Sequence, residues 1–118
     1  MIGFNHLGSL GRLGNQMFEF AALYGIATKN GYDWCIPPKS HKGIENYSLF
    51  EAFNIDGVNE NFIETDRLIG ERSFHFDKDL MDGCPDDSSL YGFFQSEKYF
   101  KHVENDIRKI FRFKDEFL

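Results

Sequence analysis

Cysteine is scarce in this sequence, and so are the features that direct a chain out of the cytoplasm. Only Cys35 and Cys84 occur among the 118 residues, and they share no short spacing. A small secreted scaffold normally carries more cysteines, so we expect two free, partly buried thiols in a reducing compartment, with a disulfide as the alternative. The sequence has no signal-peptide core and no apolar run long enough to span a bilayer. These absences predict a cytoplasmic protein.

Positive charge is also in short supply. Thirteen lysines and arginines stand against 19 aspartates and glutamates, which gives a formal net charge of −6 and a pI of about 5.1. This balance argues against a surface that binds nucleic acid. It also means that any anionic ligand must be held by local donors, because the overall field opposes it.

Metal-binding patterns are missing as well. No set of histidines, cysteines and carboxylates has the spacing of zinc ligands. Asp77-Lys78-Asp79 matches the Asp-x-Asp signature of metal–nucleotide sites, but an acidic, turn-rich stretch follows it at 80–87. Short motifs match by chance often, so we interpret this one as a solvated charge cluster rather than a magnesium site. We therefore expect no metal.

Aromatic residues, in contrast, are plentiful. The chain has 14 phenylalanines, five tyrosines and one tryptophan, and 42% of its residues are hydrophobic. This content is ample for a packed core and argues against disorder. The length fits one domain or part of one.

A glycine-rich stretch dominates the N-terminal part. Gly8, Gly11 and Gly14 are spaced three apart, between an apolar start at 2–5 and an apolar segment at 17–27. This order predicts a strand, a turn and a helix. A loop with so little side-chain bulk lets backbone N–H groups approach a ligand, and the helix N-terminus that follows favours an anion. Arg12 is the only positive charge in the loop and adds donors for a phosphate.

The residues by themselves leave the role of this loop open. Its spacing is neither the Gly-x-Gly-x-x-Gly dinucleotide fingerprint nor a P-loop. Anion binding and tight structural packing are therefore about equally supported. Asn15 and Gln16 stand where the helix begins, and they can hydrogen-bond a ligand or cap the helix.

The first 38 residues predict an α/β fold. Residues 15–30 form an expected helix that is apolar nearly all round and hence buried, and Gly31 is its expected left-handed end. Ala21, Ala22 and Gly25 would let this helix lie close to a sheet. A second strand is predicted at 32–36, before two prolines. Strand, helix and strand form a βαβ unit with a parallel sheet, whose ligands sit beyond the carboxyl ends of the strands.

The remaining elements are predicted from periodicity and turn chemistry. Residues 39–46 form a polar loop, 47–53 a short helical turn, and 62–69 and 73–76 strand-like segments. Residues 88–94 are nearly all apolar and predict a central strand. Ser96 is the expected N-cap of a helical stripe that runs from 99 to 111. For Gln95 and Ser96, capping is favoured over ligand contact.

Three stretches resemble one enzyme family. Gly11-Arg12-Leu13-Gly14-Asn15-Gln16-Met17-Phe18 resembles the N-terminal signature of the α-1,2-fucosyltransferases, glycosyltransferase family 11. Tyr47-Ser48-Leu49-Phe50 with Phe53-Asn54-Ile55 resembles a mid-region pattern of that family. Gly92-Phe93-Phe94-Gln95-Ser96-Glu97-Lys98-Tyr99-Phe100 resembles a later family segment, and the three stretches stand in the family's order.

The resemblance implies both a fold and a reaction. It implies a Rossmann-like part of a two-domain GT-B glycosyltransferase that is independent of metal. The implied reaction transfers fucose from GDP-fucose to the 2-hydroxyl of galactose in a glycan acceptor. The donor-binding residues that it implies are Gly11, Arg12, Gly14, Asn15 and Gln16; no general base is indicated. A peripheral contact with a membrane surface follows if the acceptor is lipid-linked.

The chain departs from the family in one respect. Family members are longer and carry a His-x-Arg-Arg-x-Asp motif, held to bind the nucleotide sugar, whereas no two arginines are adjacent here. We therefore expect residues 1–118 to form a single incomplete N-terminal domain that is inactive alone. Two alternatives remain: a nucleotide-sugar binding module without catalysis, and an interaction remnant that associates through an exposed sheet edge.

Overall fold

The computed structural model describes residues 1–39 and 47–114. Apart from Lys39, the polar loop predicted at 39–46 lies outside the described residues. The described chain forms a parallel sheet with helices stacked on it, which agrees with the predicted α/β class.

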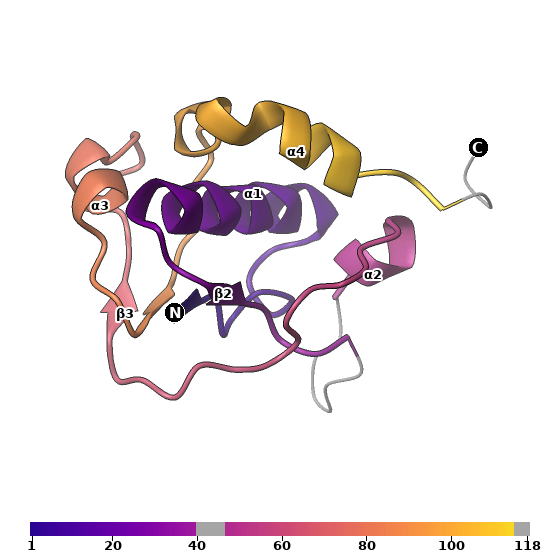
Figure 1. Ribbon diagram of the computed structural model, residues 1–118, viewed down its shortest axis with the longest axis horizontal. Coiled ribbons are helices and arrows are strands. Elements are labelled where there is room, and N and C mark those ends of the chain that lie inside the picture. The colour runs from indigo at the N-terminus through magenta and orange to yellow at the C-terminus, as the bar shows by residue number, and fades with distance from the viewer. Residues whose placement is uncertain (40–46, 115–118) are drawn as a thin grey trace.

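The sheet has four short parallel strands in the order β2-β1-β4-β3 (Figure 1). They are β1 (Ile2–Gly3), β2 (Trp34–Cys35), β3 (Leu68–Ile69) and β4 (Ser88–Leu90). Ile2 of β1 pairs with Trp34 on one side and with Ser88 on the other. The chain thus steps from β1 to β2 on one side and then crosses to the opposite edge, so β1 and β4 flank the point where the strand order reverses.

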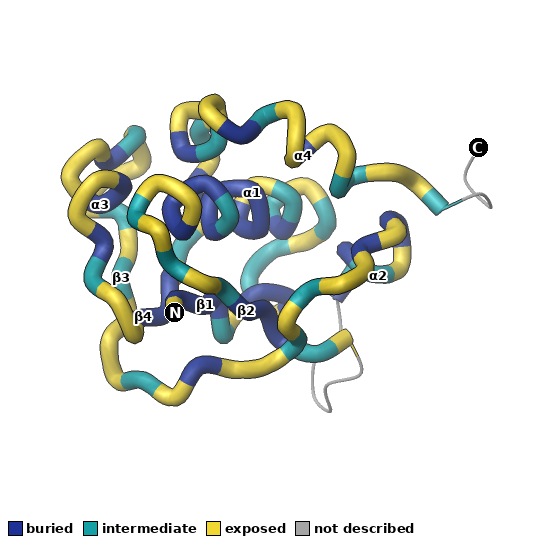
Figure 2. The backbone as a smooth tube through the Cα atoms, in the orientation of Figure 1, coloured by how far each residue is buried: buried dark blue, intermediate teal, exposed yellow. Residues whose placement is uncertain are grey.

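The predicted βαβ unit is present. Helix α1 (Leu13–Asn30) connects the parallel strands β1 and β2, and it begins two residues earlier than predicted. Gly31 ends it in the left-handed region with φ 72°, and the Gly31 N–H reaches the carbonyls of Ala27 and Thr28. Nine of the 18 residues of α1 are buried, in keeping with its apolar composition (Figure 2).

Helix α1 is the middle layer of the molecule. The sheet lies on one side of it, and α4 (Glu104–Ile110) lies on the other (Figure 1). Two 3-10 turns, η1 (Glu97–Tyr99) and η2 (Lys101–Val103), lead into α4. The small residues of α1 were expected to face the sheet, but Ala21 packs with Val103 and Ile107 instead.

The opposite face of the sheet is covered by irregular chain from the segment 54–67. Ile63 is buried there, so close to Gly3 that a Cβ on this glycine would lie 2.9 Å from Ile63 Cγ2. The Asn5 side chain bonds both the N–H and the carbonyl of Ile63, each at 2.8 Å. These backbone contacts explain how a segment without helix or strand can cover a sheet.

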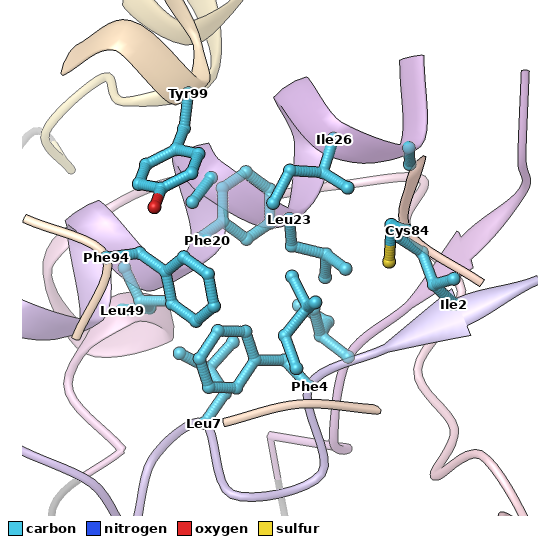
Figure 3. Close-up of a cluster of buried hydrophobic side chains, with 14 of the residues drawn as sticks. Ile2, Phe4, Leu7, Phe20, Leu23, Ile26, Leu49, Cys84, Phe94 and Tyr99 are labelled. Carbon is cyan, nitrogen blue, oxygen red and sulfur yellow. The ribbon is translucent and has the colours of Figure 1, made fainter. Parts of the chain in front are cut away.

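The main core fills the space between α1 and the sheet. Figure 3 shows Phe4, Leu7 and Phe94 close together, with the ring of Tyr99 pointing toward Phe94. Short α2 (Leu49–Ala52), at the predicted helical turn, closes one end with Leu49 and Phe53 buried. Cys35 and Cys84 are both free, as predicted, and fully rather than partly buried.

Several predicted strands are wrong. Of 62–69 only β3 is a strand; 73–76 forms no strand, and its Phe74 is 98% exposed. The strand predicted at 88–94 ends with β4 at Leu90, since Gly92 and Phe94 have φ of 144° and 50°. All three residues of β4 are buried, and two of them are the serines Ser88 and Ser89, whose burial the apolar pattern did not predict.

The acidic stretch after Asp77 was predicted as a loop and is in fact helix α3 (Lys78–Gly83). The Asp77 carboxylate accepts a hydrogen bond from the Leu80 N–H and starts the helix, and Leu80 and Met81 bury its inner face. The helix predicted at 99–111 is divided among η1, η2 and α4. Phe18, predicted as core, is 36% exposed and packs against Phe100.

Candidate functional site

The glycine-rich loop leads from β1 to an uncapped helix N-terminus. Gly8 and Gly11 have φ of 95° and 82°, a region that L-residues rarely adopt. A Cβ on Gly11 would also lie 2.6 Å from the Cβ of Asn15. Arg12 is the extended N-cap residue of α1; its side chain makes no cap hydrogen bond, and the first turn contains no acidic residue. The first backbone N–H groups of α1 are therefore available to an anion.

The predicted donor-binding residues differ in how far they are exposed to solvent. Arg12 and Gly14 are exposed, and within the described part of the chain Arg12 has no ion-pair partner. Gln16 is fully buried: its amide donates to the Gly11 carbonyl at 3.2 Å and accepts from the Ser48 N–H at 2.9 Å. Gln16 neither caps α1 nor faces solvent, but ties the loop to the start of α2.

Asn15 brings the first and third family-like stretches together. Its Oδ1 accepts a hydrogen bond of 2.6 Å from Nε2 of Gln95, 80 residues further along the chain. Ser96 is the N-cap predicted from the sequence and accepts from the Lys98 N–H at 3.3 Å, although it starts a 3-10 turn rather than a long helix. Gln95 therefore contacts the start of α1 instead of capping the turn that follows it.

A cleft of about 480 Å³ opens beside this Asn15–Gln95 pair. We call it the aromatic cleft; it is lined by Asn15, residues 71–74, residues 91–93 and Gln95. The segments 71–74 and 91–95 directly follow β3 and β4, so the cleft lies beyond the carboxyl ends of two parallel strands. The sequence predicted a ligand site at this edge, but among the predicted site residues only Asn15 lines the cleft.

Glu71 connects the two walls of the aromatic cleft, which are the segments 71–74 and 91–95. One carboxylate oxygen accepts from the Phe94 N–H at 3.2 Å, and the other accepts from the hydroxyl of Tyr99. That hydroxyl also accepts from the Asp77 N–H at 2.9 Å, and Tyr99 itself is fully buried. Burial, with a smaller contribution from Glu71, raises the pKa of Tyr99. Nothing in the sequence pattern singled out Glu71.

The Asp-x-Asp motif holds Arg72, a residue of the 71–74 wall, through hydrogen bonds to Asp77. Our interpretation of the motif as a solvated charge cluster is therefore wrong for Asp77. This carboxylate is only 6% exposed, and it accepts from Arg72 at 3.0 Å and 2.9 Å. The hydrogen bond from Arg72 holds the pKa of Asp77 below its usual value. Arg72 also pairs with exposed Asp79 at 3.1 Å. Across residues 1–39 and 47–114, no group of three His, Cys, Asp or Glu side chains has a geometry suited to a metal ion.

Glu19 is a second feature that the sequence did not reveal. It lies one helical turn after Asn15 and is fully buried, and neither carboxyl oxygen has a hydrogen-bond partner among the described residues. Desolvation raises its pKa to about 9. The carboxyl is therefore protonated and uncharged at neutral pH.

Comparison with known proteins links the chain to one kind of enzyme. A stretch of 35 residues is 51% identical to galactoside alpha-(1,2)-fucosyltransferase 2 of Sus scrofa, and its identity to the Bos taurus enzyme is also 51% over 35 residues. The chain thus contains a fucosyltransferase-like region. The match covers 30% of this chain but only 10% of either fucosyltransferase. No family model and no solved structure matches the chain. Among the described residues, no helix has the length and apolar character needed to cross a membrane.

Removing the Tyr99 hydroxyl is expected to loosen the cleft wall. In Tyr99→Phe, Glu71 loses a donor and the buried Asp77 N–H loses its acceptor, which should lower the free energy of unfolding by about 1–3 kcal/mol. Urea denaturation measures this change. The matched control is Tyr24→Phe, whose hydroxyl donates to Asp106 at the exposed surface and should cost less than about 1 kcal/mol. Equal losses in the two variants would contradict a structural role for the buried network.

Proposed function

We propose that this chain carries part of the donor site of a glycosyltransferase that moves fucose from GDP-fucose to the 2-hydroxyl of a galactoside. The observation that carries the proposal is the 35-residue stretch that is 51% identical to two galactoside α-(1,2)-fucosyltransferases. We further propose that residues 1–118 are one part of a Rossmann-like GT-B domain, completed by sequence outside this chain. The parallel sheet and its βαβ unit are compatible with that fold.

The α1 N-terminus is the element best suited to the donor phosphates. Its free N–H groups and the helix dipole attract negative charge, and Arg12 adds a guanidinium that no carboxylate neutralises in the described chain. Gly14 adds no side chain between solvent and this helix end: a Cβ built there would meet nothing within 4 Å. Local donors of this kind are required because the chain has a formal net charge of −6.

Asn15 offers a further donor beside the phosphates. Its Oδ1 accepts from Gln95, and its Nδ2 has no partner among residues 1–39 and 47–114, so the Nδ2 hydrogens can point at a ligand oxygen. As fucose departs, negative charge grows on the GDP pyrophosphate, and donors fixed before the reaction stabilise that charge most effectively. In this proposal Arg12, the α1 N–H groups and Asn15 supply that stabilisation.

Neutralising Arg12 is expected to weaken GDP binding. In the Arg12→Ala variant the loss of a charge-assisted hydrogen bond should raise the Kd for GDP roughly tenfold or more, and Asn15→Ala should act in the same direction. Isothermal titration of GDP into the 118-residue chain measures the Kd, and circular dichroism checks that the variants are folded. The control is Arg108→Ala, which removes the same charge from the exposed surface of α4. If the Kd rose no more in Arg12→Ala than in the control, the loop would be purely structural.

The transfer step needs a separate experiment. The longest polypeptide that contains this chain is incubated with radiolabelled GDP-fucose and a β-galactoside, and incorporation of label into the galactoside is expected. GDP binding without incorporation would instead favour a nucleotide-sugar binding module. If neither occurs, the proposed function is wrong.

A further inference from the structure

We propose that the aromatic cleft binds an uncharged pyranose ring. The inference rests on the proposed function, under which this ring is the galactoside that accepts fucose. It assigns the cleft to the sugar acceptor and separates it from the phosphate-binding end of α1.

Exposed aromatic rings gather at this cleft. Of the large apolar side chains that are exposed in the described chain, Phe74, Tyr91 and Phe93 all line it, at 98%, 44% and 40% exposure. The ring of Phe74 has no aromatic partner within the described residues, so its apolar faces are left to water. A sugar ring has C–H faces that can cover such a side chain, and grouped exposed apolar surface of this kind marks a ligand site.

Polar groups stand among these rings. Asn15 and Gln95 bring amide groups to the cleft, and one hydrogen bond between them leaves the Asn15 Nδ2 and the Gln95 carbonyl for a ligand. Ser73 adds a hydroxyl and Glu71 a carboxylate. Amides, hydroxyls and carboxylates are the partners that sugar hydroxyls need, since each of these hydroxyls both donates and accepts.

The charges of the cleft disfavour an anion. Among the described residues that line it, Arg72 is the one cation, and two carboxylates neutralise it: Asp77 at 2.9 Å and Asp79 at 3.1 Å. The Glu71 carboxylate adds a negative charge to the same wall. Arg12, at the N-terminus of α1, has no carboxylate partner that compensates its charge in the described chain. A phosphate is therefore drawn to Arg12, whereas the cleft suits a neutral ligand.

The geometry also places the two ligands side by side. Asn15 belongs both to the first turn of α1 and to the cleft lining, so a ring in the cleft lies next to the phosphate-binding end. Glu71 fixes both walls through Phe94 and Tyr99, which reduces the ordering cost of binding. Holding two reactants in adjacent, fixed positions is what a transfer reaction requires.

The test uses the 118-residue chain and methyl β-D-galactopyranoside, followed by saturation-transfer NMR. We expect binding with a Kd of roughly millimolar size, and a three- to tenfold weaker Kd in Phe74→Ala, the change that corresponds to losing one aromatic contact. Phe74 is almost fully exposed, so its removal should leave the fold intact. The control is Phe62→Ala, which removes another exposed phenylalanine outside the cleft and should bind the sugar as the unaltered chain does.

GDP titrations of the same proteins keep the two proposals apart. Phe74→Ala should bind GDP with unchanged affinity, and Arg12→Ala should bind the galactoside with unchanged affinity. Absent sugar binding, or equal sugar binding in Phe74→Ala and the unaltered chain, overturns this inference whatever the GDP result. Weaker GDP binding in Phe74→Ala also overturns it, because the purine base would then occupy the cleft. Failure of GDP binding in the unaltered chain contradicts the proposed donor site and leaves the sugar result standing.

Discussion

Replacing Gly25 with alanine is expected to destabilise this protein by at least about 3 kcal/mol. A Cβ at this position would lie 1.9 Å from the backbone carbonyl oxygen of Tyr99 and 2.8 Å from its carbonyl carbon. Both atoms belong to the main chain of η1, so no rotamer change can relieve the overlap, and η1 must move away from α1. Because small domains are stable by only about 5–15 kcal/mol, much of the folded population could be lost.

The same helix provides the control for this substitution. In Gly14→Ala the new Cβ meets nothing within 4 Å, so this variant should gain about 0.4–1 kcal/mol through reduced chain entropy. Thermal and urea unfolding of both variants measures the contrast. A Gly25→Ala protein as stable as Gly14→Ala would show that η1 does not approach α1 as closely as the structure has it.

Stability is also expected to fall as the pH rises from about 5 to about 9, because of Glu19. The pKa of Glu19 is raised from 4.5 to about 9 in the folded chain. Between these values the folded state keeps the proton and the unfolded state releases it, so each added pH unit favours unfolding by up to about 1.4 kcal/mol. The stabilisation is complete below the unfolded pKa and is lost as the pH approaches 9. The reason is that an ionised carboxylate in this core has no partner among the described residues.

Glu19→Gln should remove this pH dependence. The amide cannot ionise, so urea denaturation at pH 5.5, 7 and 8.5 should give similar free energies of unfolding, with the variant the more stable protein at pH 8.5 by a few kcal/mol. Glu51→Gln, which removes an exposed carboxylate from α2, should leave the slope unchanged. The lowered pKa of Asp77 acts below 3.8 and does not overlap this window. A Glu19→Gln protein with the original slope would contradict a protonated Glu19.

The cleft shows how local strain and distant contacts combine. Phe94 is buried in the core with a φ of +50°, and its N–H is held by Glu71 from the other wall. An apolar run such as 88–94 predicts a strand, but the chain turns after Leu90 and exposes Tyr91 and Phe93 at the cleft. The residues that depart from the predicted strand are therefore the ones that line the candidate site, which is where departures from local preference are expected.

The sequence alone determined the local units of this protein. The strand–helix–strand order, the buried character of α1, its left-handed end at Gly31 and the cap at Ser96 depend on hydrophobic periodicity and on the chemistry of one or two residues. Such preferences act over a few positions and do not require knowledge of the rest of the chain. The fucosyltransferase-like signature is likewise a property of contiguous residues.

The tertiary structure alone decided which residues form the site. The Asn15–Gln95 hydrogen bond joins residues that are 80 positions apart in the sequence, and the Tyr99–Glu71 hydrogen bond joins residues that are 28 positions apart. The burial of Asp77, the close contact at Gly25 and the isolated carboxyl of Glu19 likewise depend on what packs against them. The sequence gives the charge and the apolar character of each side chain. Whether a carboxylate meets an arginine, a backbone N–H or no partner is decided by how the layers pack, because these interactions act only over a few ångströms.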